Sequence, residues 1–92
     1  MSITRINEFQ AVQGKEEQLH QFLLSLIPYI TSSQGCESCE VLRHQEQLDT
    51  FVIIEKWQSV DSHKASIANY PKEDMEAAMH LFGGAPKGGY YQ

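Results

Sequence analysis

The stretch FVIIEKW, Phe51 to Trp57, runs four apolar residues directly into a Glu, a Lys and the only Trp of the chain. Successive side chains of a strand point to opposite faces of a sheet, so Phe51, Ile53 and Trp57 share one face while Val52 and Ile54 share the other. The stretch therefore predicts a strand that is apolar on both faces. Such a strand must be covered on both sides, and this requirement constrains the whole fold.

The residues before this strand predict a strand and a long helix. Residues 3–12 mix apolar and polar positions at near-strand spacing and stop at a Gln-Gly turn signal. Residues 15–33 carry apolar side chains at the i, i+3, i+4 and i+7 spacing of an amphipathic helix. Pro28 lies inside this helix and removes a backbone donor, so we expect a kink or local loosening there. Gly35 is placed to end the helix.

The remaining segments complete an alternating pattern of strands and helices. They are a strand at 36–44, a loop at 45–50, the strand at 51–57, a helix capped by Ser59 or Asp61 that runs to about Tyr70, and a helix from Glu73 to Phe82. The Gly-rich tail leaves room for a short final strand. The sequence thus predicts one domain over residues 1–92, an α+β fold of the ferredoxin-like βαββααβ type with an antiparallel sheet. Its helices cover only one face of the sheet, so we expect a second copy on the other face, as in a dimeric α/β barrel.

Charge and hydropathy argue against two classes of partner. The formal net charge is −5 and only seven Lys and Arg residues are scattered along the 92 residues, so we expect no nucleic-acid binding. The longest nearly unbroken apolar stretch, FLLSLIPYI, is far shorter than a membrane span, so we expect no membrane partner. The N-terminal residues contain no apolar signal region, which favours a cytoplasmic protein.

The two cysteines, Cys36 and Cys39, form a single C-x-x-C motif, which supplies only half of a four-ligand zinc site. Residues three apart on a regular strand point to opposite faces, so we expect two reduced thiols that diverge. No other metal-ligand spacing and no nucleotide-binding loop occur in the sequence. We therefore expect neither a metal nor a cofactor.

Four segments together resemble the antibiotic biosynthesis monooxygenase family. They are QGKEEQLHQFL after the first strand, GCESCEV after the first helix, FVIIEKWQS as the third strand, and GGAPKGGYY at the end. The resemblance implies a small dimeric ferredoxin-like barrel. It also implies an activity among those of the family, which include cofactor-independent quinol and polyketide monooxygenases, haem-degrading monooxygenases and an isomerase of a phosphorylated signalling sugar.

The chain departs from the family pattern at the histidines. Members of the family often carry a His nine residues after the Trp, where this chain has Ser66, and His63 lies one turn earlier. The haem-degrading members use an Asn on the first strand, a Trp ending the third strand and a His on the last helix. Asn7, Trp57 and His80 match these in kind, but His80 lies a turn too far from the Trp.

Trp57 has two interpretations. Its ring closes the end of the core, or it walls a pocket while its indole N–H donates to a bound oxygen, and both can hold together. Glu55 shares its face on a regular strand, and a carboxylate in an apolar setting needs a partner. Arg5 and Arg43 are the candidates, unless Glu55 faces solvent or a dimer interface.

The resemblance, together with these residues, predicts a cofactor-independent monooxygenase that oxidises a small electron-rich aromatic, such as a quinol or an anthrone, with dioxygen. The expected site residues are Asn7 to orient the substrate, Trp57 as a wall, His63 or His80 to transfer the proton, and Phe51, Met75, Met79 and Phe82 as further walls. Two alternatives remain open. One is a haem-degrading monooxygenase, and the other is a non-catalytic dimeric domain that binds a small ligand.

Overall fold

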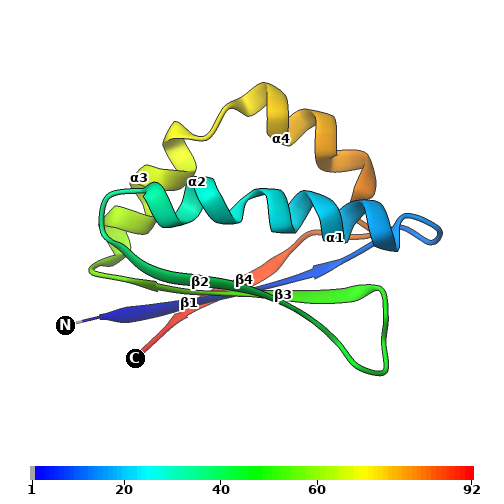
Figure 1. Cartoon of the computed structure of the whole chain (residues 1–92), viewed down its shortest axis with the longest axis horizontal. Coiled ribbons are helices and arrows are strands. Elements are labelled where there is room, and N and C mark those ends of the chain that lie inside the picture. The colour runs from blue at the N-terminus through cyan, green and yellow to red at the C-terminus, as the bar shows by residue number, and fades with distance from the viewer. Residues whose placement is uncertain (1) are drawn as a thin grey trace.

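The computed structural model describes residues 2–92 and forms one antiparallel sheet with the helices on one face (Figure 1). Its elements are β1 (Ile3–Gln10), α1 (Glu16–Ser25), α2 (Ile27–Ser32), β2 (Cys36–Arg43), β3 (Thr50–Trp57), α3 (Val60–Asn69), α4 (Lys72–Ala78), the 3-10 helix η1 (Met79–Leu81) and β4 (Lys87–Tyr91). This order confirms the predicted ferredoxin-like α+β fold, including the short final strand.

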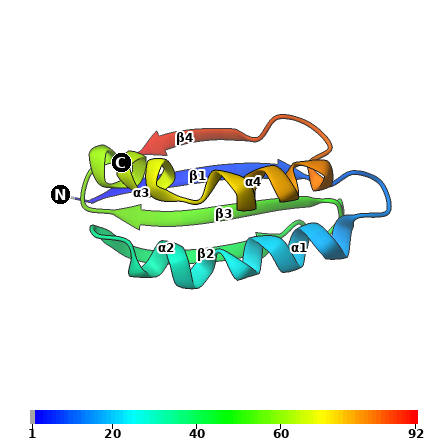
Figure 2. The ribbon, with the colours of Figure 1, turned by 90° about the horizontal axis from the view of Figure 1, so that it is seen from above.

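The four strands lie in the order β2-β3-β1-β4, and each pair of neighbours is antiparallel. The doubly apolar strand β3 is therefore central, between β2 and β1. Figure 2 shows the helices in two rows above the sheet, with α1 and α2 over β2 and with α3 and α4 nearer β1 and β3. The candidate functional site lies between these two rows and the sheet.

The helix-facing side of β3 forms the centre of the core. Phe51 and Trp57 are fully buried and Ile53 almost so, as the alternation along the strand predicts. From α1, Leu19 and Leu23 are also fully buried and join this cluster. A fully buried side chain of this size contributes roughly 1.5–3 kcal/mol to folding, so a few residues supply much of the stability of so small a chain.

The opposite side of the sheet, which we call the outer face, carries an apolar strip among polar and charged side chains. Val52 and Ile54 point to it from β3, and the register places Leu42 beside Val52 and Ile6 beside Ile54. Tyr91 adds a largely exposed ring from β4. In Figure 1 no element of the described chain covers this face. The prediction of a strand that is apolar on both sides is thus confirmed.

The long helix predicted over residues 15–33 is divided into α1 and α2 at Leu26. Pro28 lies in the first turn of α2, where a backbone N–H has no acceptor within the helix, so its missing N–H costs α2 no hydrogen bond. The same missing N–H interrupts the hydrogen-bond pattern that would continue α1. The predicted loosening therefore falls just before the proline. The last predicted helix likewise ends early, as η1. No helix of residues 2–92 is long and apolar enough to cross a bilayer.

The start of α3 is fixed by two local contacts. Ser59 is its N-cap, and the Ser59 hydroxyl accepts a hydrogen bond of 3.1 Å from the backbone N–H of Ser62. Gly35 lies directly against Ser62 with φ at +89°, and the Gly35 carbonyl accepts from the N–H of Gln58. A side chain at position 35 would push α3 away from the sheet.

The two cysteines do not diverge as predicted. A bulge between Cys36 and Ser38 shifts the register, so that Cys36 lies opposite Trp57 and Cys39 lies opposite Glu55. Both cysteines therefore share the helix-facing side of the sheet. The expectation of two unpaired thiols is met, because both cysteines are free.

We predict that Gly35→Ala destabilises the fold more than Gly14→Ala does. Both glycines have positive φ, which costs an L-residue about 1–2 kcal/mol. A Cβ at position 35 would also lie 2.6 Å from the Ser62 Cβ, and such overpacking costs about 1–3 kcal/mol more, whereas a Cβ at position 14 meets nothing within 4 Å. Chemical denaturation measures both free energies of unfolding. Equal losses would contradict the tight approach of Gly35 to α3.

Candidate functional site

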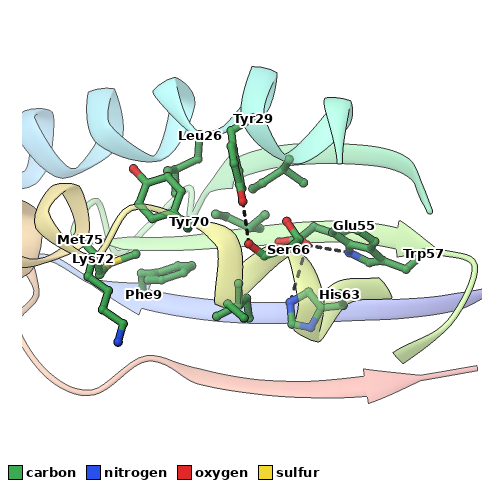
Figure 3. A pocket seen from close by; sticks show the side chains of 14 residues that line it. Phe9, Leu26, Tyr29, Glu55, Trp57, His63, Ser66, Tyr70, Lys72 and Met75 are labelled. Atoms are coloured by element: carbon green, nitrogen blue, oxygen red, sulfur yellow. Dashed lines mark hydrogen bonds and ion pairs between the residues drawn. The ribbon is translucent and has the colours of Figure 1, made fainter. Parts of the chain in front are cut away.

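A cavity of about 410 Å³ lies between the two rows of helices and the sheet. Its walls come from β1, α2, β3, α3 and α4 and from the segments between helices. They comprise Phe9, Leu26, Tyr29, Ile30, Ile53, Glu55, Trp57, His63, Ser66, Ile67, Ala68, Tyr70, Lys72 and Met75. Most of these residues are apolar or aromatic. Glu55, His63 and Ser66 lie together toward one end, whereas Lys72 lies at the other (Figure 3). This is the usual character of a small-molecule site.

A buried carboxyl group forms the polar end of the cavity. Glu55 is only 6% exposed, and its Oε1 accepts a hydrogen bond of 2.7 Å from the indole N–H of Trp57 (Figure 3). The two residues share a face because they are two apart on β3. Since the N–H of Trp57 is engaged in this bond, it is not free for a bound oxygen as one interpretation of the sequence suggested.

The second oxygen of Glu55 faces the cavity. Oε2 makes no hydrogen bond with any described residue. It is also not one of the enclosed polar atoms that lack a partner, so Oε2 is accessible from outside the protein. Because Glu55 lines the cavity, this accessible oxygen is the one that a ligand can reach. Neither predicted arginine pairs with it: Arg43 binds Glu17 instead, and Arg5 lies opposite Glu55 in the register without forming an ion pair.

An imidazole lies beside the carboxyl group. His63 is 4% exposed, and its Nε2 lies 3.9 Å from Glu55 Oε1. Its other ring nitrogen, Nδ1, lies 2.7 Å from the hydroxyl oxygen of Tyr90 on β4. The rings of His63 and Trp57 meet edge to face at 5.5 Å. Nδ1 is thus within hydrogen-bond distance of a protein oxygen, whereas Nε2 has a carboxyl oxygen nearby only at longer range.

Burial changes the protonation of both groups. It lowers the pKa of His63 from 6.5 to about 4, and the positive charges of Arg5 and Lys64 act in the same direction. Burial raises the pKa of Glu55 above its ordinary value, although the Trp57 N–H and the charge of Arg5 oppose this rise. At neutral pH the imidazole is therefore neutral, and the carboxylate is a stronger base than an exposed one.

The middle of the cavity carries hydroxyl groups that are already paired. The Tyr29 hydroxyl donates to the Ser66 carbonyl at 2.7 Å, as Figure 3 shows, and the Ser66 hydroxyl lies 2.8 Å from the Ser33 hydroxyl. These contacts link α2 to α3 across the cavity wall. Ser66 occupies the position where the family often has a His, and it lines the cavity together with His63, one turn earlier.

The structure brings together only some of the predicted site residues. Trp57, His63 and Met75 line the cavity. Phe51 and Phe82 do not: the Phe51 ring is fully buried in the core, and the Phe82 ring packs against Phe9 at 5.8 Å.

The other three predicted residues also lie outside the cavity wall. Met79 is 58% exposed, and His80 is exposed on the same 3-10 helix. Asn7 faces the helix side of the sheet but lies over Gly88 of β4. Met79 and His80 fall outside because the last helix ends early, as η1, and so turns its final residues away from the cavity.

Several site residues were absent from the predicted set, and those that carry polar groups into the argument are Glu55, Tyr29, Ser66 and Tyr90. Glu55 had a usable signal, because an acidic residue on the buried face of an apolar strand is costly unless it has a role. Tyr90 had none, since its contact with His63 joins residues 27 apart in the sequence.

Within residues 2–92, no group of three or more His, Cys, Asp or Glu side chains could hold a metal ion. The residues that match the haem-degrading motif in kind are also not brought together, since Asn7 and His80 do not line the cavity that Trp57 walls. The histidine that does line it, His63, is within hydrogen-bond distance of Tyr90 through Nδ1, and the Glu55 carboxyl group lies 3.9 Å from Nε2, on the side from which that nitrogen would bind iron. The described residues therefore do not fit a haem.

The fold and this cavity can be compared with known proteins. The family model for antibiotic biosynthesis monooxygenase matches residues 2–79, so the chain belongs to that family. The match ends before β4, so Tyr90 lies outside it. A search of curated proteins gives no match.

Solved structures with the same fold include a variant of SnoaB, a cofactor-independent oxygenase from Streptomyces nogalater. It is 16% identical with a TM-score of 0.83, and the alignment covers 99% of this chain and 91% of that one. PA3566 from Pseudomonas aeruginosa is 18% identical with a TM-score of 0.87 over 99% and 93% of the two chains. A conserved protein from Methanosarcina mazei is 18% identical with a TM-score of 0.87 over 100% and 92%. At these identities the likeness establishes the fold alone.

We predict that His63 makes stability depend on pH between about 6.5 and 4. The unfolded state takes up a proton near 6.5 while folded His63 stays neutral until about pH 4, so the free energy of unfolding falls as the pH falls through this window. Glu55 contributes a slope of opposite sign above about 4.5, because its pKa is raised on folding. Comparison with His63→Gln, which keeps Glu55, isolates the His63 contribution.

The measurement is chemical denaturation at several pH values. The difference in unfolding free energy between the wild type and His63→Gln should shrink as the pH falls from 6.5 to 4. His80→Gln, at an exposed position, is the control and should follow the wild type. A constant difference between the wild type and His63→Gln would mean that the folded imidazole is not held neutral.

Proposed function

We propose that the protein is a cofactor-independent oxygenase that uses dioxygen to oxidise a small electron-rich aromatic with an acidic hydroxyl or methylene group, such as a quinol or an anthrone. The observation that carries this proposal is the free oxygen of Glu55, a strengthened base, at the polar end of an apolar cavity. Membership of the antibiotic biosynthesis monooxygenase family supports an activity of this type.

The reaction requires few groups of the protein, namely a base and walls that hold the substrate. Glu55 Oε2 removes the acidic proton, and the resulting anion passes an electron to dioxygen. The substrate radical and superoxide then combine to a peroxide anion on carbon, which takes the proton back from Glu55 and becomes a hydroperoxide. Loss of water from this hydroperoxide leaves a carbonyl group. For an anthrone, a CH₂ group and O₂ become a C=O group and H₂O, so one oxygen atom is incorporated and the other is reduced to water.

The cavity walls serve the same chemistry by holding the ring and excluding water. Phe9 and Trp57 offer aromatic surface, and Met75 adds a polarisable contact from α4. Because His63 is neutral and lies beside the carboxyl group, it adds no positive charge that would weaken Glu55 as a base. We therefore assign proton removal to Glu55 and a supporting role to His63, and none to His80.

We further propose that the protein is a homodimer joined through the outer face of its sheet. The family resemblance implies such a dimer, and the apolar strip on the outer face supports it. Val52, Ile54 and Ile6 form the centre of that face, with Leu42 47% exposed and Tyr91 56% exposed at its edges. A second copy would bury these side chains.

We predict oxygen uptake by the wild type with at least one hydroquinone or anthrone in a modest panel. Glu55→Gln should lower kcat about 100-fold or more, because it removes the base while keeping the shape and the Trp57 contact. His80→Gln, outside the cavity, should keep wild-type turnover. Circular dichroism checks that each variant is folded.

Two outcomes would contradict the oxygenase proposal. Uptake no faster than buffer across the panel, together with tight binding of the same compounds, would favour the non-catalytic ligand-binding domain. Unchanged kcat in Glu55→Gln would remove the assigned base. If haem were instead degraded in the presence of reductant, the haem alternative would replace this proposal.

The dimer is tested by an acidic substitution on the outer face. Ile54→Glu should convert a wild type of twice the monomer mass into a folded monomer, because a carboxylate in an apolar interface is costly. Leu24→Glu, on a partly exposed position of α1, should leave the dimer intact. Sedimentation at micromolar concentration measures both, and a monomeric wild type would contradict the proposal.

A further inference from the structure

The contact between His63 and Tyr90 links the cavity to the last strand. The Tyr90 hydroxyl lies 2.7 Å from His63 Nδ1, and the two rings meet edge to face at 5.4 Å. Tyr90 is 36% exposed, so it spans from the buried imidazole to the surface. The function proposed above does not use this hydroxyl.

Tyr90 is held in place by its neighbours across the sheet. Arg5 lies directly opposite it in the register, and the Arg5 guanidinium sits over the Tyr90 ring with Cζ 4.8 Å from the centroid. Gly88, two residues earlier on the same face, leaves room for this arrangement, since a Cβ there would collide with the Arg5 guanidinium and the Asn7 amide oxygen. The ring is therefore fixed rather than loosely placed.

The position of the imidazole proton follows from the two oxygen atoms that flank the ring. Glu55 Oε1 lies 3.9 Å from Nε2, beyond hydrogen-bond distance but within electrostatic range, and it already accepts a hydrogen bond from Trp57. An accepting oxygen opposite Nε2 favours a proton on that nitrogen. Nδ1 then carries the lone pair, and the Tyr90 hydroxyl is the donor that satisfies it.

We propose that Tyr90 is a positioning residue of the active site, whose hydroxyl donates to His63 Nδ1 and thereby holds the tautomer that directs Nε2–H at Glu55. This N–H favours the ionised carboxylate, which is the form that removes the substrate proton. Without the hydroxyl, the imidazole can instead protonate Nδ1 and present a lone pair to Glu55. The catalytic part of this proposal rests on the proposed function, whereas the tautomer does not.

The charged and titratable groups around the pair define the expected pH effect. Arg5 of β1 lowers the pKa of both groups, and Lys64 of α3 lowers that of His63. From β2, Cys36 and Cys39 lie on the Glu55 side, and burial and the Glu55 charge raise their pKa, that of Cys39 to about 12. Both thiols are thus neutral near pH 7.

The test compares Tyr90→Phe with the wild type and with Tyr91→Phe. Tyr91 is the adjacent residue of β4 and points to the outer face, so its hydroxyl cannot reach His63. Nitrogen-15 NMR of the ligand-free protein reports the tautomer directly. We expect the Nε2–H form in the wild type and in Tyr91→Phe, and a mixture of both forms in Tyr90→Phe.

The second readout is the pH profile of oxygen uptake. In Tyr90→Phe its acid limb should move to higher pH, while the plateau above it stays within about twofold of the wild type. A rise of one unit in the controlling pKa lowers the ionised fraction about tenfold on the acid side. A purely structural role would lower stability without moving this limb.

Two results would overturn the proposal. One is an Nδ1–H tautomer in the wild type, and the other is a Tyr90→Phe protein whose tautomer matches that of the wild type. If no substrate of the panel is oxidised, the NMR result still decides the role of Tyr90, so this failure is distinguishable from failure of the proposed function.

Discussion

The hydrogen bond from the Trp57 indole N–H to the Glu55 carboxyl group is the interaction on which the site depends. A carboxyl group that is 6% exposed on the buried face of an apolar strand is costly unless it is paired. The indole satisfies one of its oxygens and leaves the other facing the cavity. The only Trp of the chain thus fills the end of the core and also holds an acidic group where an apolar ligand can meet it.

The sheet order makes this arrangement possible. Because β3 lies between β2 and β1, its helix-facing side is enclosed by neighbours, and Glu55 cannot reach solvent along the sheet. The two rows of helices do not close over the centre of the sheet, so a cavity remains above Ile53 and Glu55. The same strand presents Val52 and Ile54 to the outer face, so one segment of sequence serves both the site and the proposed dimer.

Much of the fold was predictable because it follows from local patterns. The alternation at Phe51 to Trp57, the helical spacing after Lys15 and the cap at Ser59 each depend on residues close in sequence. The bulge after Cys36 was not predictable, because nothing in CESCEV marks an extra residue. It places both cysteines on the same face of the sheet, whereas a regular strand would place them on opposite faces. Trp57 and His63 were each predicted as site residues, whereas Tyr90 required knowledge of which strand lies beside β1.

The measurement that tests the account most directly is a crystal structure of the protein with a hydroxylated aromatic that cannot be oxidised further, such as a hydroxyanthraquinone. The account predicts a ring between Phe9, Trp57 and Met75, with its hydroxyl oxygen within hydrogen-bond distance of Glu55 Oε2. A ligand bound instead in the serine-lined cleft between α2 and α3, or with its hydroxyl turned away from Glu55, would contradict it.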